Sequence, residues 1–209
     1  MNDKDPKWLG LARELFSLAQ AGLTYSKNEF DLERYKRLQE MSAEIIASRS
    51  YLELEPILKS FSMQAGYATP KIDVRGAAIR DGKILMVQER SDGGWTLPGG
   101  WADIGETPSA VVKREVREES GFEVQVEKLI AVYDANRFPG ASLEFYHAYK
   151  LIFLCTITGG SACPSSETIA VDFIDPGHLP QLSNYRTSKL MIAEVLAHLS
   201  HPTRPATFD

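Results

Sequence analysis

Three glutamates near the middle of the chain have a spacing at which their side chains can act together. Glu115, Glu118 and Glu119 are separated by three residues and by one, so on a helix all three project from one face. Like charges at this spacing repel one another, at a cost of about 0.2–0.5 kcal/mol per pair in an exposed helix. Carboxylate oxygens are also the ligands that hard divalent cations prefer, together with phosphate oxygens of a substrate. The cluster predicts a metal site, with Mg²⁺ as the expected ion and Mn²⁺ as a substitute.

The same run of charges has a simpler interpretation. A charged stretch such as residues 114–120, REVREES, is usually a solvated helix face with no chemical role. Arg114 is placed to reach Glu118 four residues later, or to turn back toward Glu106 in the preceding loop. The spacing alone leaves both interpretations open, so the flanking residues have to decide between them.

The residues on either side of the glutamates define a short helix. Thr107 is a good N-cap, and Pro108 falls at the first helical position, where its missing N–H costs nothing. Gly121 suits the left-handed conformation just past a helix end. The sequence therefore predicts a helix over 108–120. Before it, residues 98–100 (PGG) lack bulky side chains and let the backbone approach a ligand closely.

The segment from Leu97 to Phe122 resembles the Nudix box, G-x5-E-x7-R-E-U-x-E-E-x-G-U, in which U is a bulky apolar residue. All specified positions match, and they are Gly100, Glu106, Arg114, Glu115, Val116, Glu118, Glu119, Gly121 and Phe122. The resemblance to the Nudix hydrolase family extends over about residues 70–200. It implies a Nudix α/β/α sandwich and the hydrolysis of a nucleoside diphosphate that is linked to another group.

The resemblance also implies roles for individual residues. It implies that Glu115, Glu118 and Glu119 bind metal ions with the help of the Gly100 carbonyl, and that Glu118 and Glu119 are catalytic. It implies that Glu106 and Arg114 form a structural ion pair, and that Gly121 is structural. Divalent ions in such a site activate a water molecule and neutralise the charge that develops on phosphoryl oxygens.

The general base and the diphosphate-binding residues are harder to place. Nudix enzymes draw their base from different positions, and a common source is a loop that corresponds to residues 159–168 here, GGSACPSSET. Glu167 in this loop is the candidate base, and an ordinary exposed loop glutamate is the alternative. Arg75 and Arg90 are candidates for binding the diphosphate, because a guanidinium group matches phosphate oxygens. Either one could instead be a surface arginine.

The first third of the chain reads as helical. Residues 6–63 carry apolar side chains at helical spacing in two or three stretches, interrupted near residues 22–28. Helices this short bury too little surface to be stable alone. We expect residues 1–66 to form a small all-helical N-terminal domain that packs on the rest of the chain or on a second subunit. The domain is a candidate for dimerisation and for a lid over the substrate.

After a linker at residues 64–71 the apolar pattern changes to that of strands. Residues 73–79 and 83–88 flank Asp81–Gly82, a strong signal for a β-hairpin. Further strands are expected at 122–133, 143–157 and 168–174, a helix at 185–199, and a flexible tail at 201–209. Strands on both sides of a helix, without regular alternation, indicate an α+β fold for residues 70–200, with a mixed sheet between helices.

Composition restricts the partners and the compartment. The formal net charge of −5 argues against a general nucleic-acid binder, so DNA is not an expected partner, whereas RNA stays open. Cys155 and Cys163 are the only cysteines, and we expect both to be buried free thiols. There is no signal-peptide pattern and no apolar stretch of the roughly 20 residues that a membrane span needs. The expected location is the cytoplasm, and no membrane partner is expected.

Residues 19–42 resemble the helical extension that precedes the Nudix domain in a bacterial subgroup that includes CDP-choline pyrophosphatases. This resemblance implies hydrolysis of CDP-choline to CMP and phosphocholine, and it implies a homodimer. ADP-ribose is the main competing substrate, and other nucleoside diphosphate derivatives are further alternatives. Enzymes for ADP-ribose tend to have a proline about fifteen residues after the box; Pro139 lies seventeen after Phe122 and does not decide the substrate.

Two alternatives come from other classes of protein. Some Nudix proteins are ligand-sensing regulators, and the chain could also be a scaffold with weak catalysis. The acidic composition and the complete set Glu115, Glu118 and Glu119 favour an enzyme over both.

Overall fold

A computed structural model describes residues 6–63, 66–137, 147–183 and 186–209. The chain forms two compact units that divide between Pro70 and Lys71. Over these described residues, none of the helices has the length and apolar character needed to cross a membrane.

The first unit consists of three helices, α1 (Lys7–Tyr25), α2 (Glu29–Arg49) and α3 (Leu54–Ser62). Asn28 caps α2, because its side-chain oxygen accepts hydrogen bonds from two backbone N–H groups of the first turn. The rings of Phe16 and Phe61 lie 4.3 Å apart between centroids and join α1 to α3. The small core contains Ala12, Phe16, Ala43, Ile46, Ile57 and Phe61.

The second unit contains one mixed sheet of seven strands. The sheet order is β3-β2-β1-β5-β4-β7, and β6 pairs with β2. The pairs β1–β5 and β4–β7 are parallel, and the other pairs are antiparallel. The elements are β1 (Lys71–Arg80), β2 (Lys83–Glu89), β3 (Trp95–Thr96), α4 (Pro108–Ser120), β4 (Phe122–Asp134), the 3-10 turn η1 (Ala135–Arg137), β5 (Ala148–Gly160), β6 (Thr168–Ile174), α5 (Lys189–Ser200) and β7 (Thr207–Phe208).

The predicted hairpin is present between β1 and β2. Asp81 and Gly82 both have positive φ angles, 51° and 76°, so the turn is tight and the strands pair directly on either side of it. Asp81 is the only described non-glycine residue with a positive φ, in keeping with the tolerance of aspartate for this region.

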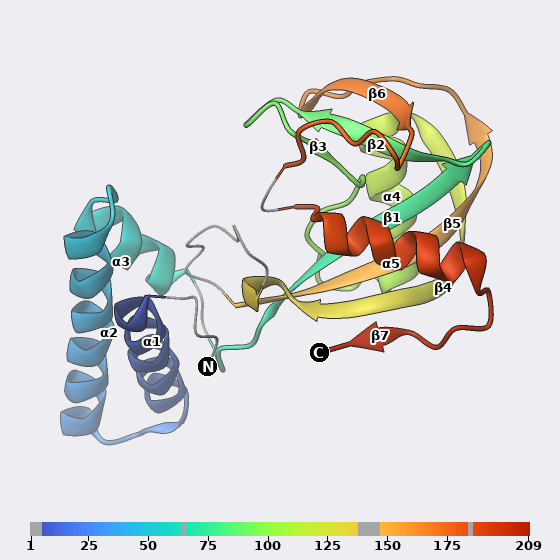
Figure 1. Ribbon diagram of the computed structural model, residues 1–209. Coiled ribbons are helices and arrows are strands. Elements are labelled where there is room, and N and C mark those ends of the chain that lie inside the picture. Colours follow the sequence, from blue (N-terminus) through green and yellow to red (C-terminus); the bar gives the residue numbers. More distant parts are fainter. Residues whose placement is uncertain (1–5, 64–65, 138–146, 184–185) are drawn as a thin grey trace. The chain divides into compact units, whose positions relative to one another are not determined.

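Helices cover both faces of the sheet, with α4 on one side and α5 on the other (Figure 1). Side chains alternate along β1, so that Val74 and Ala78 pack with α4 whereas Ala77 packs with α5. This is the α/β/α sandwich with a mixed sheet, preceded by a helical N-terminal domain, that the sequence predicted, and the fold class is confirmed.

Some predicted boundaries differ from the observed ones. The strand expected from residue 143 begins at Ala148, and residues 143–146 lie outside the described residues. The helix expected from residue 185 begins at Lys189, because the Ser188 side chain accepts a hydrogen bond from the backbone N–H of Met191 and caps it there. Cys155 is buried as expected, but Cys163 is exposed.

The expectation of a flexible tail at 201–209 was wrong. Strand β7 pairs in parallel with β4, and the tail is held to α5 by side-chain contacts. The Glu194 carboxylate accepts hydrogen bonds from Arg204 Nε at 2.9 Å and from Thr207 Oγ1 at 2.7 Å. The tail therefore completes one edge of the sheet. The composition of the tail does not predict these contacts, because its partners lie on α5 and β4.

Candidate active site

Helix α4 positions the three carboxylates, and its limits are those predicted from the sequence. The Thr107 side chain accepts a hydrogen bond from the backbone N–H of Ala110, Pro108 opens the helix, and Gly121 ends it with a φ of 76°. Val112 and Val116 pack against β1, where Gly76 has no side chain; a Cβ there would lie 2.6 Å from Val116 Cγ2. This close contact fixes the height of α4 above the sheet.

The three carboxylates share one side of α4 but differ in exposure. The side chain of Glu118 is 60% exposed, and that of Glu115 only 13%. Glu119 is buried at the C-terminal end of the helix. The cluster therefore runs from solvent into the protein.

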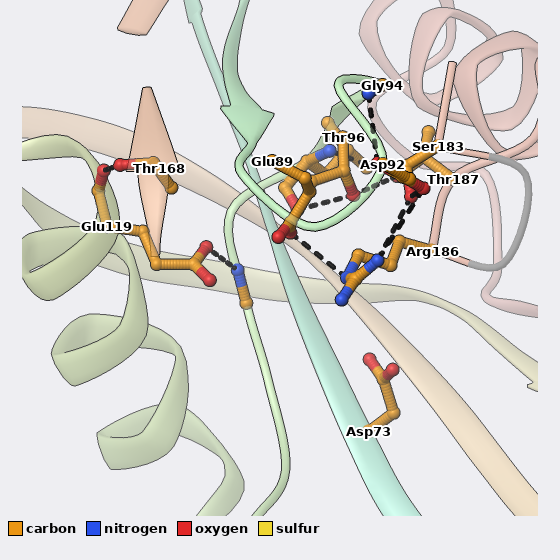
Figure 2. Close-up of polar contacts among 12 residues, drawn as sticks. Asp73, Glu89, Asp92, Gly94, Thr96, Glu119, Thr168, Ser183, Arg186 and Thr187 are labelled. Atoms are coloured by element: carbon orange, nitrogen blue, oxygen red, sulfur yellow. Dashed lines mark hydrogen bonds and ion pairs between the residues drawn. The ribbon is translucent and has the colours of Figure 1, made fainter. Parts of the chain in front are cut away.

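A backbone N–H and a side-chain hydroxyl hold Glu119 in place. Its carboxylate Oε2 accepts a hydrogen bond of 2.8 Å from the backbone N–H of Gly99, and its carbonyl accepts one of 3.0 Å from Thr168 Oγ1, as Figure 2 shows for the carboxylate contact. Gly99 has a φ of 150°, and a Cβ at this position would lie 2.0 Å from the carbonyl oxygen of Val74. Only glycine fits here. The sequence predicted that this glycine turn would bring backbone close to a ligand, and in the structure it brings the Gly99 N–H close to the Glu119 carboxylate.

The environment of Glu119 disfavours its charged form. Burial, together with the negative charges of Glu89 and Glu115, raises the pKa of Glu119 to about 7 against the opposing effects of Arg75 and of the Gly99 N–H. Burial also raises the pKa of Glu115, although Arg114 opposes this shift. Burial, more than the charge of neighbouring groups, therefore disfavours the charged forms of Glu115 and Glu119.

Arg114 lies among four carboxylates, those of Asp103, Glu106, Glu115 and Glu118. It makes a two-pronged ion pair with Glu106, at 3.0 Å from Nε and 2.8 Å from Nη2. Its Nη1 also contacts Glu115 at 2.7 Å and Glu118 at 3.2 Å. The hydrogen bond from Arg114 lowers the pKa of Glu106. The structure thus brings together the two residues for which the resemblance implied an ion pair, and a cationic group lies between two of the three cluster glutamates.

The carboxylate cluster has oxygen donors that suit a divalent metal ion. In the part of the chain that the structure describes, no group of three or more His, Cys, Asp and Glu side chains converges closely enough to hold an ion. The donor chemistry fits, however, because all three groups are hard oxygen ligands on one helix face. Gly100 adds a carbonyl that uses one of its two lone pairs on the Val74 N–H, and a Cβ at Gly100 would lie 2.9 Å from the Glu115 carboxylate.

Arg75, a predicted diphosphate ligand, lies inside the protein. Its guanidinium donates from Nε and Nη2 to the two oxygens of Asp73, at 2.8 and 2.9 Å, and from Nη1 to the carbonyl of Leu97. Lys150 Nζ lies 3.6 Å from the same carboxylate. Burial would raise the pKa of Asp73, but Arg75 and Lys150 hold it below its usual value. With 3% of its surface exposed, Arg75 is placed for a structural role rather than for direct contact with a diphosphate.

Arg90 and Glu167 are neighbours. Arg90 donates from its backbone N–H to the carbonyl of Glu167, and from Nε to the carbonyl of Ser166 at 2.9 Å. Glu167 is exposed, and the hydroxyl of the next residue, Thr168, donates to the Glu119 carbonyl at 3.0 Å. The loop that carries Glu167 therefore lies beside the end of α4, and Arg90 holds the backbone of this loop.

A second polar cluster was not predicted from the sequence. Glu89, at the end of β2, is buried and accepts a contact of 3.0 Å from Nε of Arg186 (Figure 2). Arg186 also lies near Asp92 and Ser183, and the neighbouring Thr187 bonds to Thr96. Burial raises the pKa of Glu89, and Arg186 opposes the shift. The available signal was a charged residue at the end of the apolar run KILMVQE, since a buried charge requires a partner.

Comparisons with known proteins agree with this geometry. Residues 70–195 match the NUDIX domain family, and residues 6–61 match the family described as UDP-X-like, N-terminal oligomerisation domain. The chain is 38% identical to the Bacillus subtilis protein named "Putative ADP-ribose pyrophosphatase YjhB", over 97% of both chains.

Two solved structures are similar at both sequence and fold level. One is a UDP-X diphosphatase, 31% identical with a TM-score of 0.62 and covering 97% of this chain and 98% of its own. The other is an ADP-ribose pyrophosphatase from Streptococcus suis, 34% identical with a TM-score of 0.61 and covering 68% and 100%.

Nudix hydrolases act on diphosphate bonds and generally use divalent metal ions. Three observations lead to one assignment. They are a helix whose three carboxylates differ in exposure, a glycine turn that donates to the most buried of them, and two family matches along the chain. The chain belongs to the Nudix hydrolase family and is a pyrophosphatase with an N-terminal domain of the oligomerisation type.

Proposed function

We propose that this chain hydrolyses the diphosphate linkage of a nucleoside diphosphate derivative with Mg²⁺ as its metal ion. The observation that carries the proposal is the position of Glu119, buried among other carboxylates and oriented by the Gly99 N–H. Glu115, Glu118 and Glu119, with the Gly100 carbonyl, would hold the metal, and Mn²⁺ would fit the same oxygen donors. Bound divalent ions supply a polarised water molecule and neutralise phosphoryl charge.

The protein's own groups position Glu119, the loop before α4 and the loop that carries Glu167. The Gly99 N–H fixes one oxygen of Glu119, and the ion pair of Glu106 with Arg114 ties the loop before α4 to the helix. Arg90 holds the backbone of the loop that carries Glu167. We propose that Glu167 removes the proton from the attacking water, because it is exposed beside a site whose other carboxylates are buried or committed to Arg114.

Two groups of substrates are supported to different degrees. The two near-full-length relatives are named for ADP-ribose and for UDP-X, and these names favour ADP-ribose or a UDP-linked compound as the substrate. CDP-choline rests only on the resemblance of the N-terminal extension, and neither of these two relatives is named for it. We therefore place ADP-ribose and UDP-linked compounds before CDP-choline.

The first experiment is a screen with Mg²⁺ and Mn²⁺ across ADP-ribose, UDP-linked sugars, CDP-choline, CDP-ethanolamine, capped nucleotides and RNA. We expect turnover of a nucleoside diphosphate derivative, and we expect Glu118→Gln to lower kcat by roughly 100-fold or more, the scale of one lost electrostatic stabiliser. Chromatography of the products identifies the phosphorus attacked. If nothing is turned over with either metal, the chain is not an enzyme of this class, and a ligand-sensing or scaffold role takes its place.

The N-terminal unit is proposed to form a homodimer. Its small core leaves large apolar side chains exposed, more than a small helical unit alone would be expected to carry. They include Leu11, Leu18, Tyr25, Phe30, Met41, Tyr51 and Leu52. Sedimentation equilibrium of the full chain should give twice the monomer mass, and Leu18→Glu should shift it toward the monomer. A monomeric wild-type chain at micromolar concentration contradicts the dimer and removes the basis for a lid supplied by the partner.

The role of Glu167 has a direct test. Replacing it by glutamine removes the proton acceptor but keeps the shape of the loop, so kcat at saturating Mg²⁺ should fall by about 10²–10⁴-fold, the usual contribution of a general base. Asp172→Asn, a change at an exposed acid on β6, is the matched control and should leave kcat unchanged. A kcat for Glu167→Gln within a few-fold of wild type would show that another group takes the proton.

The raised pKa of Glu119 makes the stability of the metal-free protein depend on pH. Because the pKa is about 7 in the folded protein and 4.5 ordinarily, the folded state binds more protons between these values. The free energy of unfolding should therefore fall as the pH rises from 4.5 to 7, by about 2–3 kcal/mol from this group. Urea unfolding in EDTA measures it.

Glu119→Gln should flatten this pH dependence, because glutamine keeps the acceptor for the Gly99 N–H but cannot ionise. The exposed Glu127→Gln is the control and should leave the wild-type slope. Equal slopes for Glu119→Gln and wild type would mean that Glu119 titrates normally.

A further inference from the structure

Most arginines near the carboxylate helix already use their donors on protein groups. Arg75, Arg90 and Arg114 each make at least two side-chain hydrogen bonds to fixed acceptors. Those acceptors are Asp73 and the Leu97 carbonyl, the carbonyls of Ser166 and Thr168, and Glu106, Glu115 and Glu118. A phosphate group would have to compete with these acceptors.

Arg186 differs from Arg75 and Arg114, in which Nε, Nη1 and Nη2 all contact protein acceptors. Among the described residues Arg90 also has an Nη1 without a partner, but its Nε and Nη2 hold the backbone of the Glu167 loop. Nε of Arg186 contacts Glu89 at 3.0 Å, and its Nη1 contacts the Ser183 hydroxyl at 3.3 Å and lies 3.8 Å from Asp92. Its Nη2 has no protein partner among the described residues, and 31% of the side chain is exposed. Arg186 thus presents an open donor edge, whereas its inner edge is fixed (Figure 2).

The backbone at Arg186 is fixed as firmly as its inner edge. Lys150 Nζ donates to the Arg186 carbonyl at 2.7 Å. Next along the chain, the Thr187 hydroxyl accepts a hydrogen bond of 3.0 Å from the backbone N–H of Leu97. Leu97 begins the turn whose Gly99 N–H holds Glu119, so Arg186 is tied to the segment that orients the deepest carboxylate.

The burial of Glu89 also bears on the role of Arg186. Glu89 has 4% of its surface exposed, and Nε of Arg186 lies 3.0 Å from its carboxylate. A buried carboxylate that needed only neutralisation would be served by a fully enclosed partner, as Asp73 is by Arg75. Here the partner is partly exposed, and a guanidinium with a free edge is suited to phosphate oxygens.

We propose that Arg186 binds a phosphate group of the substrate diphosphate through its open Nη2 edge, with Glu89 and Ser183 holding the guanidinium in place. The inference rests on the proposed function and names a substrate-binding residue for it. It assigns to Arg186 the contact that the sequence had suggested for Arg75 and Arg90.

The test is equilibrium binding of inorganic pyrophosphate and of ADP, measured by calorimetry with Mg²⁺ on the full chain. Arg186→Gln should weaken both by at least tenfold and raise KM for the best substrate more than it lowers kcat. Arg186→Lys should recover part of the loss, because an ammonium group keeps the charge but not the fork. Arg204→Gln is the matched control, since Arg204 makes the same kind of Nε–carboxylate contact at 2.9 Å with Glu194, and it should bind as wild type.

The outcomes separate the inference from the proposed function. The inference is overturned if folded Arg186→Gln binds the probes with a Kd within twofold of the wild-type value. It is also overturned if the wild-type protein binds neither probe. Should Arg186→Gln fail to fold with Glu89 left unpaired, the double variant Glu89→Gln/Arg186→Gln replaces it and should show the same loss. If wild type binds the probes and Arg186→Gln does not, yet no substrate is turned over, the hydrolase proposal fails while the binding role of Arg186 stands.

Discussion

The hydrogen bond between the Gly99 N–H and the Glu119 carboxylate is the contact on which the site depends. It joins the glycine turn to α4, and it exists only because Gly99 has room against β1 and Gly76 lets α4 approach the sheet. Thr168, at the start of β6, bonds to the carbonyl of the same glutamate. One residue thus connects the helix, the turn and the strand that follows the Glu167 loop.

Buried charge in this protein is organised in pairs around that contact. Asp73, Arg75 and Lys150 balance one another beneath the turn, and Arg186 balances Glu89 beside it. A buried charge without a partner costs several kcal/mol. These pairings therefore allow the elements around Glu119 to carry charged side chains in the interior of the protein. In the carboxylate cluster, burial raises the pKa of Glu115 and Glu119 in spite of the nearby Arg114 and Arg75. A divalent cation would favour the charged forms of these groups and so offset the effect of burial.

Sequence reasoning succeeded where interactions are local. The limits of α4 follow from Thr107, Pro108 and Gly121, and the hairpin follows from Asp81–Gly82, because cap and turn geometry depends on a few adjacent residues. It failed for the tail at 201–209, whose partners lie on α5 and β4. It also offered Arg75 as a candidate ligand of the diphosphate. Alternation along a strand puts Asp73 and Arg75 on the same face, but the sequence does not show that this face is buried around Arg75.

By itself the sequence determined the helix, the order of its carboxylates, the glycine turn and, through the spacing of the Nudix box, the family. Tertiary structure alone decided which carboxylate is buried, which arginines are committed to protein acceptors, and that Arg186 keeps an open edge beside Glu89. The physical reason is that spacing along a helix sets direction within one element. Burial, pKa and the pairing of charges depend on which other elements pack against it, and those contacts come from residues that are distant in sequence, such as Lys150 with Arg186 and Leu97 with Thr187.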